Sequence, residues 1–385
     1  MKQAAEISVL MISLDEGLLG QAESGDVLTR HCEYAEKIQH LHIIVIGGTN
    51  RQPVVLSEKC TAYPTGSKNI GSIYAAYQIA KKLITANKID LIDTQDPHLT
   101  GLIGVCLKRK FKLPLEVHFH GDFWDNANWR KESAKNLIYA LLQPRVVAQA
   151  DAIRVASPAI ERSLRSSKIN QLIEIISTPI DEKIEQQIIP AQVEGLKKEY
   201  GQKILLFVGR FVAAKNIIFM LQVFKKVQSQ VPEVTLVMIG DGPLLAEAKK
   251  FAENSALDKN CFFIGTKNHQ ELASYYAAAS LLVLLSTNES FGKVIVEAGI
   301  CGTSAVASAT TGARFIIQQD TTGMIVPIND ENQSVKTLVK LLSDEQLRAG
   351  LAMKAKSEYR ERFNRQASIE KIITLWLTLA NQDTK

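Results

Sequence analysis

Two carboxylates in this chain flank a short glycine-containing loop that could bind a phosphorylated sugar. Glu289 and Glu297 lie on either side of Phe291-Gly292. An apolar run precedes this loop, and the helical pattern that follows it covers 294–301 and includes Glu297. Unpaired N–H groups and the dipole at a helix N-terminus favour an anion such as a phosphate. Because two carboxylates would repel a bare phosphate, we expect them to face sugar hydroxyls. The pattern therefore predicts a sugar-nucleotide ligand.

Two cations follow the first predicted strand in the second half of the chain. Arg210 comes directly after Gly209 at the strand end, and Lys215 lies further along the same loop. They would stand near a helix start, where a diphosphate could bind, although solvated surface side chains are the alternative interpretation. A turn begins at Gly240 after the next strand, but it lacks the third glycine of a dinucleotide fingerprint and is a weak signal alone.

Parallel strands must position these loops, because ligands of doubly wound sheets bind at the carboxyl ends of strands. Short apolar runs alternate with helical patterns in both halves, which is typical of a parallel sheet. The first half contains predicted strands at 7–12, 41–46, 91–93, 115–119, 152–156 and 172–176. The second half contains predicted strands at 204–208, 234–239, 261–264, 281–285, 304–307 and 324–326. We predict an α/β fold with two Rossmann-like doubly wound parallel-sheet domains facing across a cleft.

The length of 385 residues suits two such domains. A polar stretch at 181–200 surrounds Pro190, and we interpret it as a linker followed by a lead-in helix. The predicted domains therefore cover residues 1–190 and 191–366. Apolar residues recur at helical spacing in the tail at 367–385, so we expect a helix that packs back toward the N-terminal domain.

Composition narrows the class of protein. A net charge of +5 with 22% charged residues does not by itself imply a nucleic-acid partner, and we expect none. The five cysteines form no Cys-x-x-Cys pair, so neither a zinc site nor a disulfide framework is indicated. No apolar run approaches the roughly 18 residues of a membrane span. We expect a cytoplasmic protein that neither spans a membrane nor is exported.

Several segments within residues 203–330 resemble the retaining glycosyltransferases of family 4 (group 1), which have the GT-B fold. The segments that carry this resemblance are Gly209-Arg210 with Lys215, Ile239-Gly240-Asp241-Gly242-Pro243, Phe263-Ile264-Gly265, Glu289-Ser290-Phe291-Gly292 through Glu297-Ala298, and Asp320-Thr321-Thr322-Gly323 before Val326-Pro327. In the first half, His118-Phe119-His120-Gly121-Asp122 is similar to the histidine-containing donor loop of the family.

The resemblance implies transfer of a sugar from a nucleoside-diphosphate sugar to a hydroxyl acceptor, in cell-surface polysaccharide or glycolipid synthesis. The catalytic residues would be His120 and Glu289. Glu289 would bind hydroxyls of the transferred sugar, and His120 would either bond a sugar hydroxyl through its neutral ring or turn its backbone carbonyl toward the reacting carbon. Arg210 and Lys215 would hold the diphosphate, and Glu297 the ribose. The full set of implied donor-binding residues is Gly25, Arg210, Lys215, Gly240, Gly265, Ser290, Phe291, Gly292, Lys293, Val294 and Glu297. Gly25 would contact the diphosphate or the acceptor, and a purely conformational role in a turn is an equal alternative.

No metal or other cofactor is expected. The sequence contains no Asp-x-Asp, and fixed Arg and Lys side chains with a helix N-terminus can stabilise a diphosphate leaving group in place of a divalent ion. The implied partners are a nucleotide-sugar donor, with UDP-sugars among the candidates, and a saccharide or lipid-linked acceptor. The N-terminal domain would bind the acceptor and the C-terminal domain the donor, with domain closure completing the site.

Basic residues cluster in the first half of the chain, beside two tryptophans. Most such runs are solvated helix ends, but contact with an anionic membrane that presents a lipid-linked acceptor is the sharper hypothesis. It would place the protein peripherally on the inner face of the membrane. The residues concerned are Lys108, Arg109, Lys110, Lys112, Trp124, Trp129, Arg130, Lys131, Lys135 and Arg145.

Three other functions stay open at the level of sequence. A sugar-nucleotide 2-epimerase would share the two-domain architecture, but the stretch Glu289–Gly292 argues against it. A catalytically silent nucleotide-sugar-binding module would keep the phosphate loop without an acceptor site. A dehydrogenase is disfavoured because the segment 13–20 after the first strand lacks Gly-x-Gly-x-x-Gly.

Overall fold

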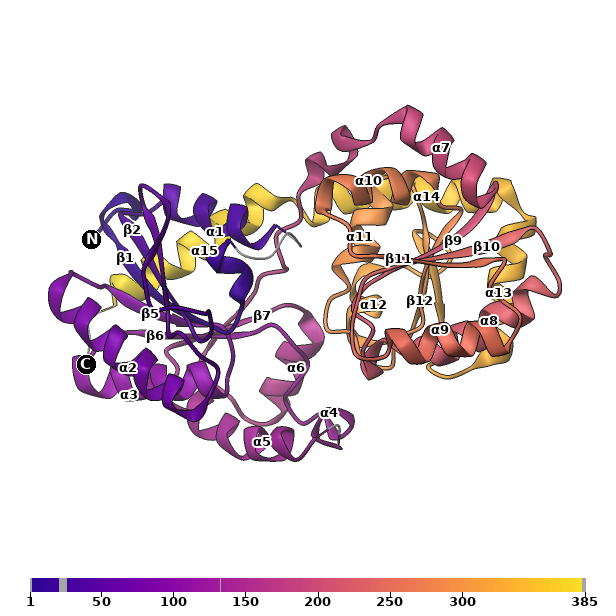
Figure 1. The fold of residues 1–385 in the computed structure, drawn as a ribbon. Coiled ribbons are helices and arrows are strands. Elements are labelled where there is room, and N and C mark those ends of the chain that lie inside the picture. Colours follow the sequence, from indigo (N-terminus) through magenta and orange to yellow (C-terminus); the bar gives the residue numbers. More distant parts are fainter. Residues whose placement is uncertain (1, 21–25, 132, 383–385) are drawn as a thin grey trace. The chain divides into compact units, whose positions relative to one another are not determined.

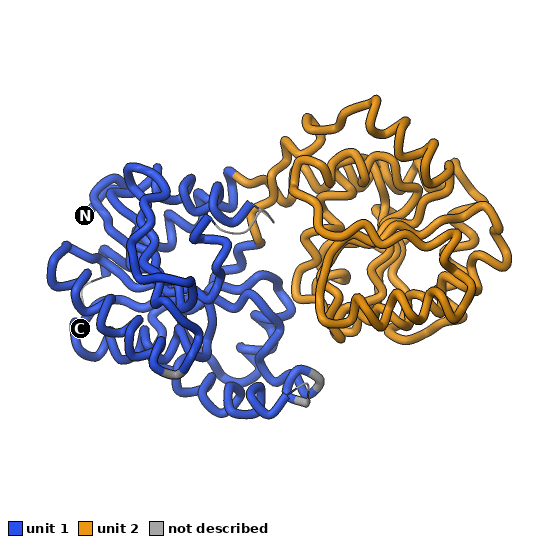
Figure 2. The backbone as a smooth tube through the Cα atoms, in the orientation of Figure 1, with its two compact units in different colours: residues 1–177, 366–385 blue, residues 178–365 orange. Residues whose placement is uncertain are grey.

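The computed structural model describes residues 2–20, 26–131 and 133–382, and it divides the chain into two compact units. Unit 1 contains Met1–Ser177 together with Gln366–Lys385, and unit 2 contains Thr178–Arg365 (Figure 2). Each unit has a sheet of mainly parallel strands with helices on both faces (Figure 1). No helix within the described ranges is both long and apolar enough to cross a membrane.

The sheet of unit 1 has the strand order β3-β4-β2-β1-β5-β6-β7-β8. All neighbouring strands pair in parallel except β3, which pairs antiparallel with β4 at the sheet edge. The strands are β1 (Ser8–Ser13), β2 (His40–Val45), β3 (Val54–Ser57), β4 (Cys60–Pro64), β5 (Leu91–Thr94), β6 (Leu115–Phe119), β7 (Ala152–Val155) and β8 (Leu172–Ile175).

Alternation of side chains along the strands explains why this sheet is covered on both faces. Leu10 and Ile12 of β1 belong to one apolar cluster, and Val9 and Met11 belong to the other. Every residue of β1 is buried, as expected for a central parallel strand. The helical segments of unit 1 are η1 (Ala4–Glu6), η2 (Glu16–Leu19), α1 (Val27–Glu36), α2 (Ile70–Ala86), α3 (Leu99–Phe111), α4 (Ala127–Lys131), α5 (Ala134–Val147), α6 (Pro158–Ser166) and α15 (Arg365–Ala380).

The C-terminal helix α15 belongs to the core of unit 1, beside α1 (Figure 1). Its Trp376 is fully buried, packs edge-on against Tyr34 at 6.0 Å, and donates a hydrogen bond of 2.7 Å from Nε1 to Glu116. Glu116 lies on the central strand β6. Helix α15 therefore packs into the unit that the N-terminal half of the sequence forms.

Unit 2 has a six-stranded, fully parallel sheet in the order β11-β10-β9-β12-β13-β14. Its strands are β9 (Lys203–Val208), β10 (Val234–Ile239), β11 (Cys261–Gly265), β12 (Leu281–Leu284), β13 (Ala305–Ser308) and β14 (Gly323–Val326). Its helical segments are η3 (Glu182–Gln187), α7 (Pro190–Tyr200), η4 (Ala213–Lys215), α8 (Ile217–Gln228), α9 (Leu245–Asn254), α10 (His269–Ala278), α11 (Lys293–Ile300), α12 (Thr311–Ile316), α13 (Glu331–Ser343) and α14 (Glu345–Arg362).

The stretch interpreted as a linker is folded into unit 2. Ile184 of η3 is fully buried in the apolar core of that unit. The Ile189 N–H donates to Ser274 Oγ at 3.2 Å, and Ser274 Oγ donates to Gln192 at 3.0 Å. Because these contacts tie η3 and α7 to α10, the division of the chain falls after Ser177 rather than near Pro190.

Candidate functional site

In unit 2, the two predicted charged loops meet at the point where the strand order reverses. The chain runs from β9 outward through β10 to β11 and then returns to β12 on the other side of β9. Loops at the carboxyl ends of two such strands diverge and leave a crevice for a ligand. The loop after β9 carries Arg210 and Lys215, and the loop after β12 carries Glu289.

Lys215 and Glu289 form an ion pair across this point. Both side chains are mostly buried, and the backbone holds their loops together: Thr287 N–H donates to Ala214 O at 2.9 Å, and Asn216 Nδ2 donates to Leu285 O at 3.2 Å. Arg210, which precedes Lys215 on the same loop, is exposed. The structure therefore joins one predicted cation and one predicted carboxylate into a single charged pair.

The loop between Glu289 and α11 is fixed by an aromatic anchor and a glycine contact. Phe291 is buried and packs edge-on against Phe363 at 5.6 Å. Gly312 N–H donates to Glu289 O at 2.7 Å, and a Cβ on Gly312 would lie 2.3 Å from Phe291 O. Gly292 then caps α11 with a φ of 91°, a conformation that glycine adopts at little cost.

The first turn of α11 begins directly after this cap. Lys293 and Val294 are its first residues, and Ser290 precedes the cap on the loop. The first N–H groups of a helix point out of its N-terminus without intrahelical partners. The backbone predicted to face an anion therefore lies at the N-terminus of α11, as the sequence indicates.

Glu297 lies one turn into α11 and is only 3% exposed. Its carboxylate accepts hydrogen bonds from Tyr276 Oη at 2.9 Å and His269 Nε2 at 3.1 Å, and it pairs with Lys293 Nζ at 3.2 Å. Burial by itself would raise the pKa of Glu297, but the Lys293 charge and the hydrogen bonds from His269 and Tyr276 outweigh burial and lower the pKa to about 2. Glu297 is therefore a fixed anion at every physiological pH.

The predicted glycines at Gly240 and Gly265 have backbone roles. Gly240 has a φ of 137°, and a Cβ there would lie 2.0 Å from Gly209 O. Gly240 N–H donates to Gly265 O at 2.8 Å, and Gly265 has a φ of 79°. The loops after β9 and β10 can approach one another so closely because Gly240 lacks a side chain. A Cβ on Gly265 would meet nothing within 4 Å, so that glycine serves only its positive φ.

Replacing Gly240 with alanine should therefore destabilise unit 2 by about 2 kcal/mol or more, because the methyl group collides with backbone and the φ is unfavourable. Differential scanning calorimetry would measure the loss. The control is Gly350→Ala on α14, where a Cβ meets nothing within 4 Å and alanine favours the helix. Equal stability of the Gly240 variant and wild type would contradict this packing role.

Unit 1 contains a separate recess of about 220 Å³ at the carboxyl ends of β1, β5 and β6. Seven of its nine lining residues carry polar or charged groups that could bond to hydroxyls, and the other two are leucines. The residues that line it are Ser13, Leu14, Asp15, Leu18, Arg30, His31, Gln95, Asp96 and His120.

His120 lines this recess and is exposed to solvent. Its Nε2 lies 2.5 Å from Gln95 Oε1, and its ring centroid is 3.5 Å from that of His118. Burial of the rest of the ring, with the charges of Arg154 and Arg30, lowers the pKa of His120 well below its usual value. Burial likewise lowers the pKa of His31 to about 3. Neutral imidazoles both donate and accept, as hydroxyl recognition requires.

The structure places the predicted site residues in two groups. Arg210, Lys215, Gly240, Gly265, Glu297 and the loop 289–294 lie in unit 2, and His120 lies in unit 1. Gly25 lies outside the described residues. The sequence interpretation missed Arg30, His31 and Asp96. Asp96 directly follows the β5 strand pattern. The expectation that ligand sites lie at the carboxyl ends of parallel strands could therefore have identified it.

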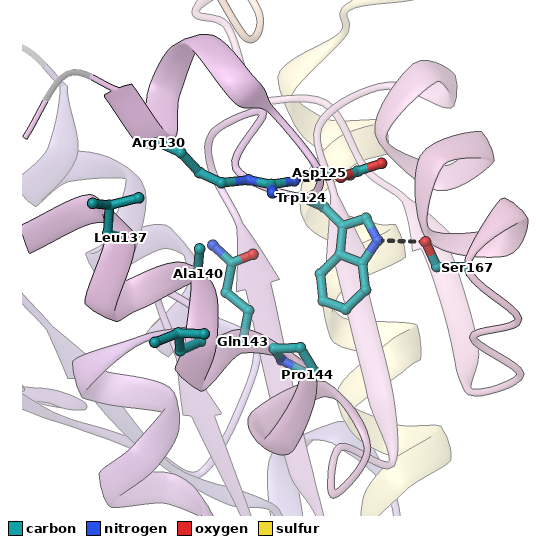
Figure 3. A pocket seen from close by; sticks show the side chains of 9 residues that line it. Trp124, Asp125, Arg130, Leu137, Ala140, Gln143, Pro144 and Ser167 are labelled. Atoms are coloured by element: carbon teal, nitrogen blue, oxygen red, sulfur yellow. Dashed lines mark hydrogen bonds and ion pairs between the residues drawn. The ribbon is translucent and has the colours of Figure 1, made fainter.

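The two tryptophans proposed as membrane anchors are buried, and that part of the prediction is wrong. Trp124 donates from Nε1 to Ser167 Oγ at 2.9 Å, and Trp129 stacks on His98 at 5.2 Å. In the basic run at the end of α3, Lys108 pairs with Asp151. The Trp124 indole N–H (Figure 3) and the Lys108 ammonium group therefore have partners within the protein.

Comparisons with known proteins agree with this architecture. Residues 29–183 match Glycosyltransferase Family 4, and residues 189–358 match Glycosyl transferases group 1. The chain is 26% identical over 242 residues to N-acetyl-alpha-D-glucosaminyl L-malate synthase of Bacillus anthracis, covering 62% of each chain. It is 27% identical over 247 residues to alpha-monoglucosyldiacylglycerol synthase of Streptococcus pneumoniae, covering 61% of this chain and 55% of the relative. The matched regions are thus less than two thirds of these relatives.

Solved structures share the whole two-unit fold. Sucrose-phosphate synthase from Thermosynechococcus elongatus has a TM-score of 0.84 at 22% identity, covering 97% of this chain and 99% of that one. HepE of Anabaena, solved in complex with UDP and glucose, has a TM-score of 0.77 at 18% identity, covering 97% and 100%. The fold is therefore that of the GT-B proteins. The chain belongs to the group 1, family 4 glycosyltransferases.

Proposed function

We propose that this glycosyltransferase uses a nucleoside-diphosphate sugar as donor and transfers the sugar, with retention of anomeric configuration, to a hydroxyl of a saccharide or lipid-linked acceptor. The observation that carries the proposal is the mostly buried Lys215–Glu289 pair, which directly precedes the N-terminus of α11 in the loop that carries Glu289. It sets a cation, a carboxylate and a helix dipole around one point. A diphosphate bonded to a sugar offers the complementary groups.

The donor's nucleotide would be held by Glu297 and the loop cations. A carboxylate accepts about four hydrogen bonds, so three protein partners leave Glu297 about one position for a ribose hydroxyl. Arg210 and Lys215 would contact the diphosphate together with the N–H groups of α11. Departure of the nucleotide concentrates negative charge on the diphosphate, where fixed cations are most effective. We propose that no divalent metal is needed.

Glu289 would act on the transferred sugar by accepting hydrogen bonds from its hydroxyls. In the protein its carboxylate already pairs with Lys215, which orients it. A bound donor would then share Lys215 between this carboxylate and the diphosphate. Glu289 thereby links the sugar's position to that of the leaving group.

For the hydroxyl groups of acceptor or sugar, the recess in unit 1 offers neutral imidazoles and the carboxylates of Asp15 and Asp96. His120 would bond a sugar hydroxyl through the ring nitrogen that now faces Gln95. The name of one relative, alpha-monoglucosyldiacylglycerol synthase, supports a role in glycolipid synthesis, and polysaccharide synthesis is the other role that we propose. The proposal extends that class of acceptor to this chain.

Calorimetric titration with UDP-, GDP- and ADP-sugars tests the proposal, with UDP-glucose first because HepE was solved with it. We expect one donor series to bind wild type and to bind Arg210→Ala at least about tenfold more weakly, because a charge-assisted contact contributes roughly 1.5–3 kcal/mol. Absence of binding by every nucleotide sugar would overturn the proposed donor.

Glu297→Gln is expected to weaken donor binding about tenfold while changing turnover at saturating donor little, because the ribose contact is the same in ground and transition states. Since its pKa of about 2 lies far below the assay range, the ionisation of Glu297 should leave affinity unchanged between pH 5 and pH 8. Titration of both proteins at the two pH values measures this. Unchanged affinity in the variant would remove Glu297 from the ribose site.

A further inference from the structure

Two histidines that line the recess of unit 1 have ring tautomers fixed by protein groups. The first is His31 on α1, whose Nδ1 lies 2.7 Å from the backbone carbonyl oxygen of Val27. A carbonyl oxygen can only accept a hydrogen bond, so Nδ1 carries the ring hydrogen. Burial lowers the pKa of His31 to about 3, so the ring is neutral at pH 7. Its Nε2 therefore has a lone pair and no hydrogen, and it can only accept.

The Nε2 atom of His31 has no partner among the described residues. The bond to Val27 is the one side-chain hydrogen bond that His31 makes within residues 2–20, 26–131 and 133–382. The residue is only 5% exposed, yet Nε2 is not sealed in the core and is accessible from the recess. Mostly buried polar atoms in proteins usually have a hydrogen-bond partner. A ligand that offers a hydrogen at this point would supply the missing one.

His120 has the opposite tautomer. Its Nε2 lies 2.5 Å from Gln95 Oε1, and Gln95 Nε2 donates to Asp93 Oδ1 at 2.7 Å. Asp93 Oδ2 accepts from Arg154 at 3.2 Å, so this carboxylate takes hydrogen bonds at both oxygens and orients the Gln95 amide. The Gln95 carbonyl therefore faces His120, and Nε2 of His120 carries the ring hydrogen. A sugar hydroxyl that replaces Gln95 would accept a hydrogen bond from His120.

Arg30, the neighbour of His31 on α1, adds donors to the recess. It lines the recess and is only 9% exposed. In the part of the chain that the structure describes, its guanidinium has one charged partner, Asp26, at 3.6 Å from Nη1, which is longer than a hydrogen bond. A guanidinium has five N–H donors. Arg30 can therefore donate to an oxygen of a ligand that also meets His31.

We propose that His31 binds the sugar acceptor by accepting a hydrogen bond from one of its hydroxyl groups at Nε2, while Arg30 donates to a neighbouring oxygen. This role rests on the proposed transferase function, and it assigns the chemical class of the acceptor. Asp15 and Asp96 also line the recess and would repel a phosphate or carboxylate, so the group recognised here is a neutral polyol. An ether or carbonyl oxygen has no hydrogen to donate and would leave Nε2 unpaired.

Long-range proton–nitrogen NMR of the isotope-labelled full chain tests the tautomers without any donor or acceptor present. The chain has seven histidines, and the variants His31→Gln and His120→Gln identify two of the ring patterns by their loss. At pH 7 we expect the hydrogen on Nδ1 of His31 and on Nε2 of His120. A His31 ring with its hydrogen on Nε2, or a charged His31 ring, would overturn the proposal.

Free monosaccharides are the probe ligands: glucose, galactose, mannose and N-acetylglucosamine. At least one of them is expected to shift the Nε2 resonance of His31 to lower frequency, as a hydrogen bond to that nitrogen does. Calorimetry should then show that the same sugar binds His31→Phe roughly fivefold to tenfold more weakly, the effect of one lost hydrogen bond. Phenylalanine keeps a ring that can pack edge-on against Tyr34 but has no acceptor.

The matched control is His42→Phe. His42 of β2 is also buried, and burial lowers its pKa to about 4, but its Nδ1 lies 3.1 Å from Tyr63 Oη and it does not line the recess. This variant should bind the monosaccharide like wild type. Tryptophan fluorescence verifies that both variants are folded, because all three tryptophans lie in unit 1.

Deoxyfluoro analogues of the monosaccharide that binds identify the hydroxyl that His31 recognises, because fluorine is close to a hydroxyl in size and cannot donate. One analogue should bind wild type as weakly as the parent sugar binds His31→Phe, and it should lose nothing further in that variant. The proposal is overturned if no sugar moves the His31 resonance, or if His31→Phe and His42→Phe bind the sugar equally well. None of these measurements uses a nucleotide sugar, so a failed donor titration would remove the proposed donor and leave this result standing.

Discussion

Replacing Lys215 with methionine is expected to lower turnover by about two to three orders of magnitude, because a preorganised charge at a developing anion contributes roughly 3–4 kcal/mol to the transition state. Methionine keeps the length and apolar stem of the side chain, but it removes the charge that pairs with Glu289. In the proposed donor complex, the leaving diphosphate would lose one of the two cations assigned to it, and Glu289 would lose the partner that orients it. Initial rates at saturating donor measure the effect.

The matched control is Lys226→Met on α8. Lys226 is also ion-paired, with Glu331, but the pair is exposed and lies outside the loops that follow β9 and β12. Surface pairs contribute little to stability, so both turnover and thermal unfolding should stay close to wild type. Equal turnover of the Lys215 variant and this control would contradict the assignment of Lys215 to the leaving group.

Replacing Arg154 with methionine is expected to destabilise unit 1 by about 3–5 kcal/mol, the usual effect of removing one partner from a buried ion pair. Arg154 of β7 pairs with Glu116 Oε1 at 2.8 Å and with Asp93 Oδ2 at 3.2 Å, and all three side chains are buried. The variant leaves two carboxylates without a cation. Urea unfolding followed by tryptophan fluorescence measures unit 1, because Trp124, Trp129 and Trp376 all belong to it.

The same network predicts how stability changes with pH. Two carboxylates share one guanidinium, and burial raises the pKa of Glu116 to about 8 despite the opposing effect of Arg154. A raised pKa means that the folded state holds the proton more tightly than the unfolded state. The contribution of Glu116 is therefore fully present below its unfolded pKa of about 4.5 and is lost as pH rises through about 8.

Glu116→Gln separates this proton from the rest of the network. The amide oxygen can still accept the hydrogen bond that Trp376 donates, but the side chain no longer titrates. The free energy of unfolding should then fall less between pH 5 and pH 8 than it does in wild type. Parallel pH profiles of the two proteins would contradict a shared proton, and a fully stable Arg154→Met protein would contradict the buried charge network itself.

Most of the fold could be predicted from sequence because buried parallel strands leave continuous apolar runs. All twelve predicted strands occur, and both sheets are doubly wound. Strands β3 and β4 were missed because their side chains alternate between buried and partly exposed, with Val55 strongly exposed, so no apolar run marks them. The N-terminal sheet consequently has an antiparallel edge strand that the prediction of a parallel sheet did not include.

The loop 289–297 could be predicted because glycine, a carboxylate and a helix start are all visible in the local sequence. The Lys215–Glu289 ion pair could not be predicted, because it depends on β9 lying beside β12. Local sequence patterns do not determine the order of strands in a sheet. Arg30 and His31 were not predicted as site residues for a related reason. In the sequence of an amphipathic helix, a polar residue that faces a buried recess cannot be distinguished from one that faces solvent.

The most direct test of the central claim follows the anomer released from the donor. Proton NMR of wild type with the nucleotide sugar that binds, using water as the acceptor and EDTA throughout, would detect the first sugar product. We predict that an α-linked donor releases the α anomer first, that EDTA leaves the rate unchanged, and that Lys215→Met nearly abolishes release. First appearance of the β anomer would contradict retention, and loss of turnover in EDTA would contradict the metal-free site.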